Sequence, residues 1–322
     1  MSDIRIILDE DNEPFYYKEK YIVVSRDNND IGIRMFVPLI KNNKYIFYFP
    51  GRWQNSKDWA FENAIDDIRY YLLTKGFSII TIDYRTNFQN YRKTEHFNGI
   101  NWHLSDFIQD STYVLNYLYK KQNIKKAYLM GFSMGAAQIF LLNQSVINTK
   151  IEGIIALDGG IKQKKLQLNY FHQNNSKKLL KNPAWDKKFR DKYIKLVHSL
   201  NKKGKNYEIN INKIRILLNG EKWWPENPVS ECKTISSSII HNDSILDKHM
   251  SDISCPILCV MAIDKLGADS HRSLCSAILT SSKDIKSICL ENWSHLDILS
   301  HVQAKEKVFA PINKWLLDKR CE

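Results

Sequence analysis

The stretch AYLMGFSMG, residues 127–135, decides the fold. Residues 127–132 form an apolar run of strand length and residues 134–144 read as a helix, so Ser133 stands at a strand-to-helix junction. Gly131 and Gly135 flank this serine at the GxSxG spacing. A serine at such a junction can lie on a tight turn that a Cβ on either side would obstruct, and the turn projects the hydroxyl above the carboxyl edge of the sheet. The spacing therefore predicts that Ser133 is a nucleophile.

Outward from this junction, strand and helix patterns alternate along the chain. Apolar runs of strand length predict strands at residues 20–26, 31–38, 44–49, 77–84, 127–132, 151–157, 255–263 and 285–290. Apolar residues at helical spacing predict helices at 56–75, 104–119, 134–144 and 296–317. Strands that alternate with helices over this length are typical of an α/β protein with a doubly wound, mostly parallel sheet.

One long segment interrupts the alternation. Residues 160–250 replace a crossover with a mainly helical pattern, so we expect an insertion between two parts of one core, 1–159 and 251–322. This segment carries 19 Lys and Arg against 8 Asp and Glu, a net charge of +11 out of +12 for the whole chain. Such a surface can be a solvating coat, can attract anionic substrates, or can rest on an anionic membrane. The segment has no recognisable nucleic-acid module, so we expect no nucleic-acid partner.

Composition excludes several classes of protein. The chain has 322 residues, of which 43% are hydrophobic, and this excludes wholesale disorder. There is no apolar run long enough to span a membrane, and the N-terminus lacks the pattern of a signal peptide. The six cysteines form no CxxC pair, which argues against a zinc site. We therefore expect a cytoplasmic protein with reduced thiols and no metal.

The order of three residues makes the chain resemble the α/β-hydrolase family over nearly all of its length except the insertion. In that family the nucleophile is followed by an acid and then by a histidine. Here Ser133 is followed by Asp264, after the strand at 255–263, and then by His295, directly before the last helix. The resemblance implies a Ser-His-Asp triad of these three residues. Asp158 is a rival acid because it follows the strand before the insertion, where some members of the family carry their acid, and Asp269 is a second rival because it lies five residues after Asp264.

The family's oxyanion hole supplies further candidates. The resemblance implies one backbone donor at Met134, which follows the nucleophile, and a second at Arg52 or Trp53, where Gly51 lets the loop come close. The chain departs from the family in having Pro50-Gly51 where His-Gly is frequent, and Asp83-Tyr84-Arg85-Thr86 where Asp-x-Arg-Gly is frequent. These departures remove no catalytic atom.

The expected activity follows from these residues. The resemblance implies a serine hydrolase that cleaves a carboxylic ester of a small-molecule acyl substrate through an acyl-serine intermediate and needs no cofactor. The same triad serves amidases, peptidases, thioesterases and acyltransferases, and a binding protein without catalysis can share the fold. The resemblance also implies that the insertion, residues 160–250, is a cap over the active site. Trp223 and Trp224, in this predicted cap, are candidates for lining an acyl or aromatic pocket.

Overall fold

The described part of the chain forms one extended sheet. The computed structural model describes residues 3–51, 54, 56, 61, 63–85, 104–142, 150–161, 250–263, 272–293 and 295–318. Its strands are β1 (Asp3–Leu8), β2 (Pro14–Arg26), β3 (Asn29–Pro38), β4 (Tyr45–Phe49), β5 (Ser78–Asp83), β6 (Ala127–Phe132), β7 (Ile151–Leu157), β8 (Ile257–Ile263) and β9 (Ile285–Glu291). Its α-helices are α1 (Ile68–Thr74), α2 (Leu104–Lys121), α3 (Met134–Leu141), α10 (Arg272–Ala277), α11 (Asp297–Ser300) and α12 (Ala310–Asp318).

The strand order explains where a site can form. The described strands are hydrogen-bonded in the order β1-β2-β3-β5-β4-β6-β7-β8-β9. The pairs from β5-β4 through β8-β9 are parallel, whereas β1, β2, β3 and β5 pair antiparallel. This confirms the predicted mostly parallel sheet. Ligands of such sheets bind beyond the carboxyl ends of the strands, so the segments that follow β4, β6, β7 and β9 meet at one edge.

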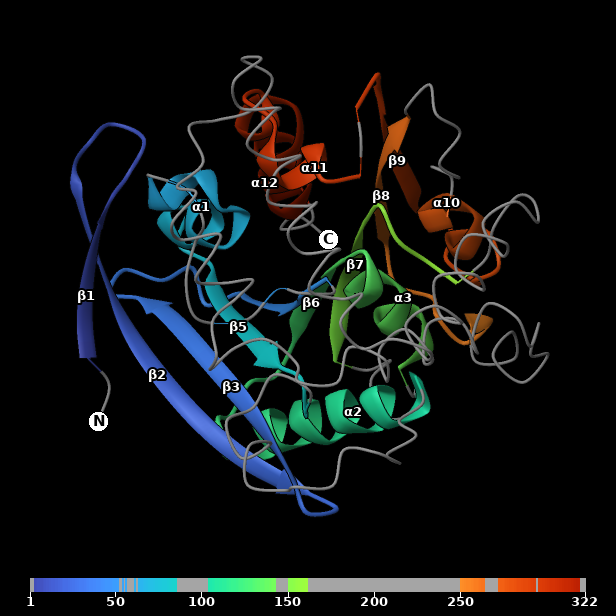
Figure 1. Cartoon of the computed structure of the whole chain (residues 1–322), viewed down its shortest axis with the longest axis horizontal. Helices are drawn as coiled ribbons and strands as arrows, with labels where there is room; N and C mark the ends of the chain where they lie inside the picture. Colours follow the sequence, from blue (N-terminus) through green and yellow to red (C-terminus); the bar gives the residue numbers. More distant parts are fainter. Residues whose placement is uncertain are drawn as a thin grey trace, which may run out of the picture.

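Helices cover both faces of the sheet, and alternate residues of each buried strand face opposite layers. Along β6, Leu129 belongs to the core cluster that includes Phe107 of α2 and Ile139 of α3. Its neighbour Met130 belongs to the second cluster, which includes Trp315 of α12. Figure 1 shows α2 and α3 on one side of the sheet and α1, α11 and α12 on the other. A fully buried side chain of this size contributes about 1.5–3 kcal/mol to folding.

The antiparallel end of the sheet is longer than the sequence pattern predicts. Strands β2 and β3 form a hairpin, and its two-residue turn has positive φ at Asp27 (50°) and Asn28 (59°). Strand β1 was not predicted. Its exposed Ile4 and Ile6 obscure the alternation that marks a half-buried strand, because only Ile7 of this strand is buried.

Two predicted helices differ from the structure. The helix expected over 56–75 begins only after Asp67, whose side chain accepts a hydrogen bond from the Arg69 amide and caps α1. A single 3-10 turn, Ala64–Asp66, precedes it. The expected last helix is divided into α11, a π-helical turn at Lys305–Phe309, and α12. The division falls at His301, which has extended backbone (ψ 145°).

The predicted cap lies almost entirely outside the described residues, because the structure describes only residues 160, 161 and 250 of it. The two described ends, Ile161 and Met250, pack against the same core cluster. Over the described ranges, no helix combines the length and the apolar character needed to cross a membrane.

Candidate active site

Ser133 lies on a strained turn between β6 and α3. Its backbone has φ 55° and ψ −113°, a conformation that residues with a side chain rarely adopt. Its N–H donates to the carbonyl of Leu157, 2.9 Å away, so the end of β7 supports the turn from the side. Strain of this kind persists where surrounding structure enforces it, and it is concentrated at functional sites. The turn has the geometry expected of a nucleophile elbow.

The glycines of the motif are required by close backbone contacts. A Cβ on Gly131 would lie 2.5 Å from the carbonyl carbon of Gly135. A Cβ on Gly135 would lie 2.0 Å from the carbonyl oxygen of Phe49, at the end of β4. Rigid backbone cannot move aside as a side-chain tip can. The spacing of glycines in the sequence therefore reflects the tight packing of the elbow against itself and against β4.

His295 stands between β9 and α11, and its ring lies beside the elbow. The imidazole stacks on the ring of Phe132, the residue before Ser133, with a centroid distance of 4.8 Å and an interplanar angle of 21°. The histidine side chain remains 41% exposed, so solvent can reach it. Phe132 was not a predicted site residue; its position next to the serine is the only signal in the sequence.

A carboxylate contacts the histidine, and it belongs to Asp158. Nδ1 of His295 lies 2.6 Å from Oδ2 of Asp158. A carboxylate can only accept, so Nδ1 carries the hydrogen and Nε2 is left as the acceptor of the neutral ring. The other carboxylate oxygen, Oδ1, accepts a hydrogen bond from the Ala262 N–H of β8 at 3.1 Å. The acid is therefore fixed from one side by β8 and orients the imidazole from the other.

The backbone of Asp158 is as unusual as that of Ser133. Its φ is 45°, in the left-handed region that an aspartate tolerates better than most residues. The next residue, Gly159, runs directly against the elbow, because a Cβ there would lie 2.1 Å from the carbonyl oxygen of Ser133. The serine, the histidine and Asp158 thus meet at one edge of the sheet, beyond the carboxyl ends of β6 and β7.

The choice of acid changes accordingly. The sequence favoured Asp264, with Asp158 and Asp269 as rivals. Asp264 and Asp269 lie outside the described residues, whereas Asp158 occupies the hydrogen-bonding position at Nδ1 of His295. Among the described residues, Asp158 is the carboxylate in contact with Nδ1, so the proposal below takes Asp158 rather than Asp264 as the acid.

The oxyanion candidates are described in part. Met134 is the first residue of α3, where backbone amides have no partner within the helix. Arg52 and Trp53 lie outside the described residues, as do Trp223 and Trp224. The preceding Gly51 is described, and its N–H donates to Oε1 of Gln54 at 2.8 Å.

Comparisons with known proteins agree with this fold. No protein-family model and no curated protein matches the chain by sequence. Among solved structures, the enol-lactonase from Burkholderia xenovorans LB400 superposes with a TM-score of 0.61 at 14% identity, over 94% of this chain and 100% of that one. A carboxylesterase of the thaumarchaeon Nitrososphaera gargenis gives 0.62 at 14% identity, over 92% and 98% of the two chains. A thermophilic esterase from Thermogutta terrifontis gives 0.59 at 14% identity, over 94% and 98%.

The strand order, the elbow and these likenesses define the class of protein. The chain has the α/β-hydrolase fold. The three similar structures are hydrolytic enzymes by their descriptions, and each likeness extends over more than nine-tenths of this chain.

Proposed function

We propose that this protein is a serine hydrolase that cleaves carboxylic esters through an acyl-serine intermediate. Ser133 is the nucleophile, His295 the general base and Asp158 the residue that orients the histidine. The observation that carries the proposal is the contact of 2.6 Å between His295 Nδ1 and Asp158, with the imidazole stacked beside the strained serine turn. The esterase and lactonase likenesses support hydrolysis at a carboxylic ester.

The first half of the reaction forms the acyl-enzyme. Ser133 Oγ attacks the ester carbonyl carbon while its proton passes to Nε2 of His295. The carbonyl π electrons move to oxygen, and the resulting oxyanion accepts hydrogen bonds from backbone N–H groups. The oxyanion then re-forms the carbonyl, the bond to the alkoxy oxygen breaks, and the histidine returns its proton to the departing alcohol. Asp158 stabilises the imidazolium and holds its orientation throughout.

The second half uses water in the same way. His295 takes a proton from water as the water oxygen attacks the acyl carbon, and Ser133 Oγ leaves with that proton. The carboxylic acid is released and the serine is regenerated. We assign the oxyanion donors to the amide of Met134 and to an amide of Arg52 or Trp53. Each step uses only groups of the chain and water.

The substrate class is proposed from the cap. Trp223 and Trp224 are proposed to line an acyl pocket, so Trp223→Ala or Trp224→Ala should shift the preferred acyl length. Unchanged preference in both variants at unchanged stability would place the tryptophans away from the site.

If the cap charge captures anionic substrates, kcat/KM for an anionic ester should fall as the salt concentration rises, while kcat/KM for a neutral ester changes little.

The test of the proposal is a panel of chromogenic esters, thioesters and amides of graded acyl length. We expect turnover of esters by the native protein and loss of turnover in Ser133→Ala. Ser282→Ala is the matched control, because Ser282 precedes β9 at the opposite edge of the sheet. Faster turnover of thioesters or amides would move the activity to a thioesterase or amidase. Transfer of the acyl group to an added alcohol in preference to water would make the protein an acyltransferase. Absence of turnover across the panel would favour a binding protein on this fold.

A further inference from the structure

Three consecutive side chains at the end of β5 have no part in the proposed triad, yet all three are buried. Asp83, Tyr84 and Arg85 are 1%, 2% and 5% exposed. Buried polar groups of this kind are retained where they hold specific partners. Asp83 and Tyr84 contact the segment that follows β4, whereas Arg85 contacts α2.

Tyr84 holds the beginning of that segment. Its hydroxyl donates to the carbonyl oxygen of Pro50 at 2.8 Å, in a buried hydrogen bond. The ring packs edge-on against Phe107 of α2, with a centroid distance of 5.6 Å. A ring fixed in this way gives its hydroxyl a defined position, so Pro50 and the adjoining Gly51 are held from β5.

Asp83 holds the segment six residues further along. Its carboxylate accepts hydrogen bonds from the Ser56 N–H at 2.7 Å and from the Ser56 hydroxyl. The hydroxyl of Tyr21 also donates to it, at 3.1 Å. Complete burial raises the pKa of the Asp83 carboxyl, and the hydrogen bonds from Ser56 oppose this rise. A Cβ on Gly32 would lie 2.1 Å from the Tyr21 hydroxyl, so the glycine makes room for this contact.

Gln54 stabilises the turn between Pro50, which Tyr84 holds, and Ser56, which Asp83 holds. Its Oε1 accepts from the Gly51 N–H at 2.8 Å and from the Tyr48 hydroxyl at 3.0 Å. In return, the Gln54 N–H donates to the Gly51 carbonyl at 3.2 Å. Gly51 and Gln54 are thus joined in both directions. The two residues between them in sequence are Arg52 and Trp53, one of which is the proposed second oxyanion donor.

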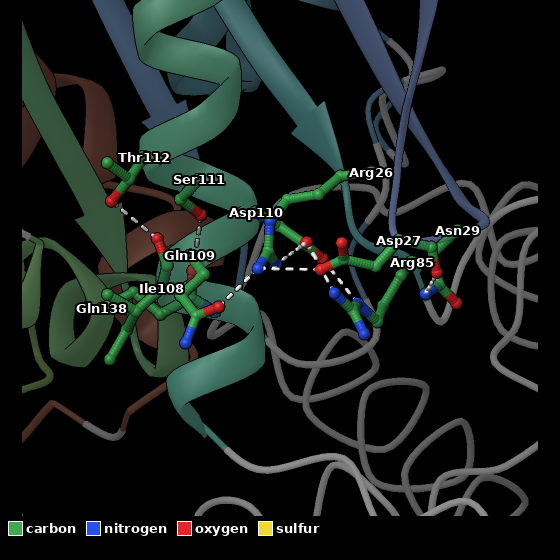
Figure 2. Close-up of polar contacts among 10 residues, drawn as sticks. All are labelled: Arg26, Asp27, Asn29, Arg85, Ile108, Gln109, Asp110, Ser111, Thr112 and Gln138. Carbon is green, nitrogen blue, oxygen red and sulfur yellow. Dashed lines mark hydrogen bonds and ion pairs between the residues drawn. The ribbon is translucent and has the colours of Figure 1, made fainter.

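Arg85 holds the end of β5, from which Asp83 and Tyr84 extend, against α2. As Figure 2 shows, its guanidinium makes a paired contact with Asp110 of α2, Nε to Oδ2 at 2.6 Å and Nη2 to Oδ1 at 2.6 Å. Arg26, at the end of β2, donates to the same carboxylate at 3.0 Å. The end of β5 is therefore tied to α2 and to β2, and its side chains are held in place when they contact the segment after β4.

We propose that Asp83 and Tyr84 are positioning residues that set the backbone of Pro50, Gly51 and Ser56 for stabilisation of the oxyanion. The inference rests on the proposed function. It gives a role to the Asp83-Tyr84-Arg85 motif, which the triad leaves without one. An oxyanion donor interacts with the transition state more strongly than with the bound ester. A displaced donor therefore lowers kcat and leaves KM nearly unchanged.

The test is Tyr84→Phe, which removes one hydroxyl and keeps the ring. Tyr119→Phe is the matched control, because Tyr119 is buried and its hydroxyl donates to the backbone carbonyl of Lys150, at the opposite edge of the sheet. Both variants are compared for kcat and KM on one ester, and for the inhibition constant of a trifluoromethyl ketone. Such a ketone adds to the serine and places a negative oxygen in the oxyanion hole.

We expect kcat of Tyr84→Phe to fall about 10- to 100-fold, since a misplacement of about 1 Å can cost 100-fold. The inhibition constant of the ketone should rise in parallel, and KM should stay within about twofold, as expected when only transition-state binding is lost. The control should show neither change. If Tyr84→Phe does not fold, Ser56→Ala, which keeps its N–H bond to Asp83, serves in its place.

Two failures are distinguishable. Native protein that turns over the ester, with Tyr84→Phe indistinguishable from Tyr119→Phe in both kcat and ketone binding, overturns the positioning role and leaves the proposed function standing. Native protein that neither turns over esters nor reacts with a fluorophosphonate overturns the proposed function, and the positioning role with it.

Discussion

Replacing Asp158 by Asn should disable the histidine without disturbing its surroundings. The Ala262 N–H donates to Oδ1 of Asp158, so the carbonyl oxygen of an asparagine side chain would turn toward this donor. Its NH₂ group would then face Nδ1 of His295, which lies 2.6 Å from the native carboxylate. Nδ1 would have to become an acceptor, and Nε2 would carry the hydrogen. A ring in that tautomer cannot accept the proton of Ser133.

The size of the effect separates this role from a structural one. A wrong tautomer in a serine triad lowers kcat by about 10⁴-fold. At 1.36 kcal/mol for each tenfold change, this equals about 5.4 kcal/mol of activation free energy. Loss of an ordinary hydrogen bond costs about 1 kcal/mol, which would lower kcat close to fivefold. A loss of kcat beyond about 1,000-fold therefore identifies Asp158 as the acid.

The assay compares Asp158→Asn with Asp264→Asn, using kcat on one ester and circular dichroism to check folding. We expect the loss in Asp158→Asn, and a change of less than about tenfold in Asp264→Asn, because a residue outside the triad does not set the tautomer. If Asp264→Asn loses activity by orders of magnitude while Asp158→Asn keeps it, the acid is Asp264 and the reasoning from the His295 contact is refuted.

Two further predictions concern packing and thiol reactivity. Gly135→Ala should destabilise the protein by about 3 kcal/mol in urea unfolding, because its Cβ would lie 2.0 Å from the rigid backbone oxygen of Phe49. Gly153→Ala, whose Cβ would meet the side chain of Trp315 at 2.7 Å and the nearest backbone oxygen, of Pro256, only at 3.2 Å, should cost less, and an equal cost would contradict the argument. Iodoacetamide should alkylate the exposed Cys289 before Cys259 at neutral pH, since burial raises the pKa of Cys259 to about 12. Peptide mass mapping checks the order of alkylation, and faster reaction at Cys259 than at Cys289 would show that β8 is accessible to the reagent.

The elbow could be predicted from the sequence because local and tertiary requirements coincide there. The strand that ends at Phe132 is buried on both faces, so it reads as a continuous apolar run. Gly131 and Gly135 are needed at close contacts within the elbow and with β4. The strand pattern and the glycine spacing therefore indicate the same turn.

The identity of the acid could not be predicted in the same way. Asp158 and Asp264 follow β7 and β8, which are adjacent parallel strands ending at the same edge. From the sequence alone, the predicted strand order allows either carboxylate to lie near His295, and no local signal shows which of the two reaches Nδ1. In the structure the contact depends on a backbone φ of 45° at Asp158 and on the Ala262 amide of the neighbouring strand. Both are tertiary features.

The start of α1 shows the same limit. Apolar residues over 56–75 have helical spacing, yet Ser56 is held by Asp83, a residue 27 positions further along the chain. The cap at Asp67 then starts the helix later than the periodicity predicts. Tertiary contacts can override a local helical pattern wherever a buried partner offers better hydrogen bonds.

Covalent labelling tests the central claim most directly. A fluorophosphonate reacts with a serine only where a neighbouring base and an oxyanion hole activate it. We predict one adduct per chain, located on Ser133 by peptide mass spectrometry, absent in Ser133→Ala and greatly slowed in His295→Ala. An unlabelled native protein, or an adduct on any other residue, would contradict the assignment of Ser133 as an activated nucleophile.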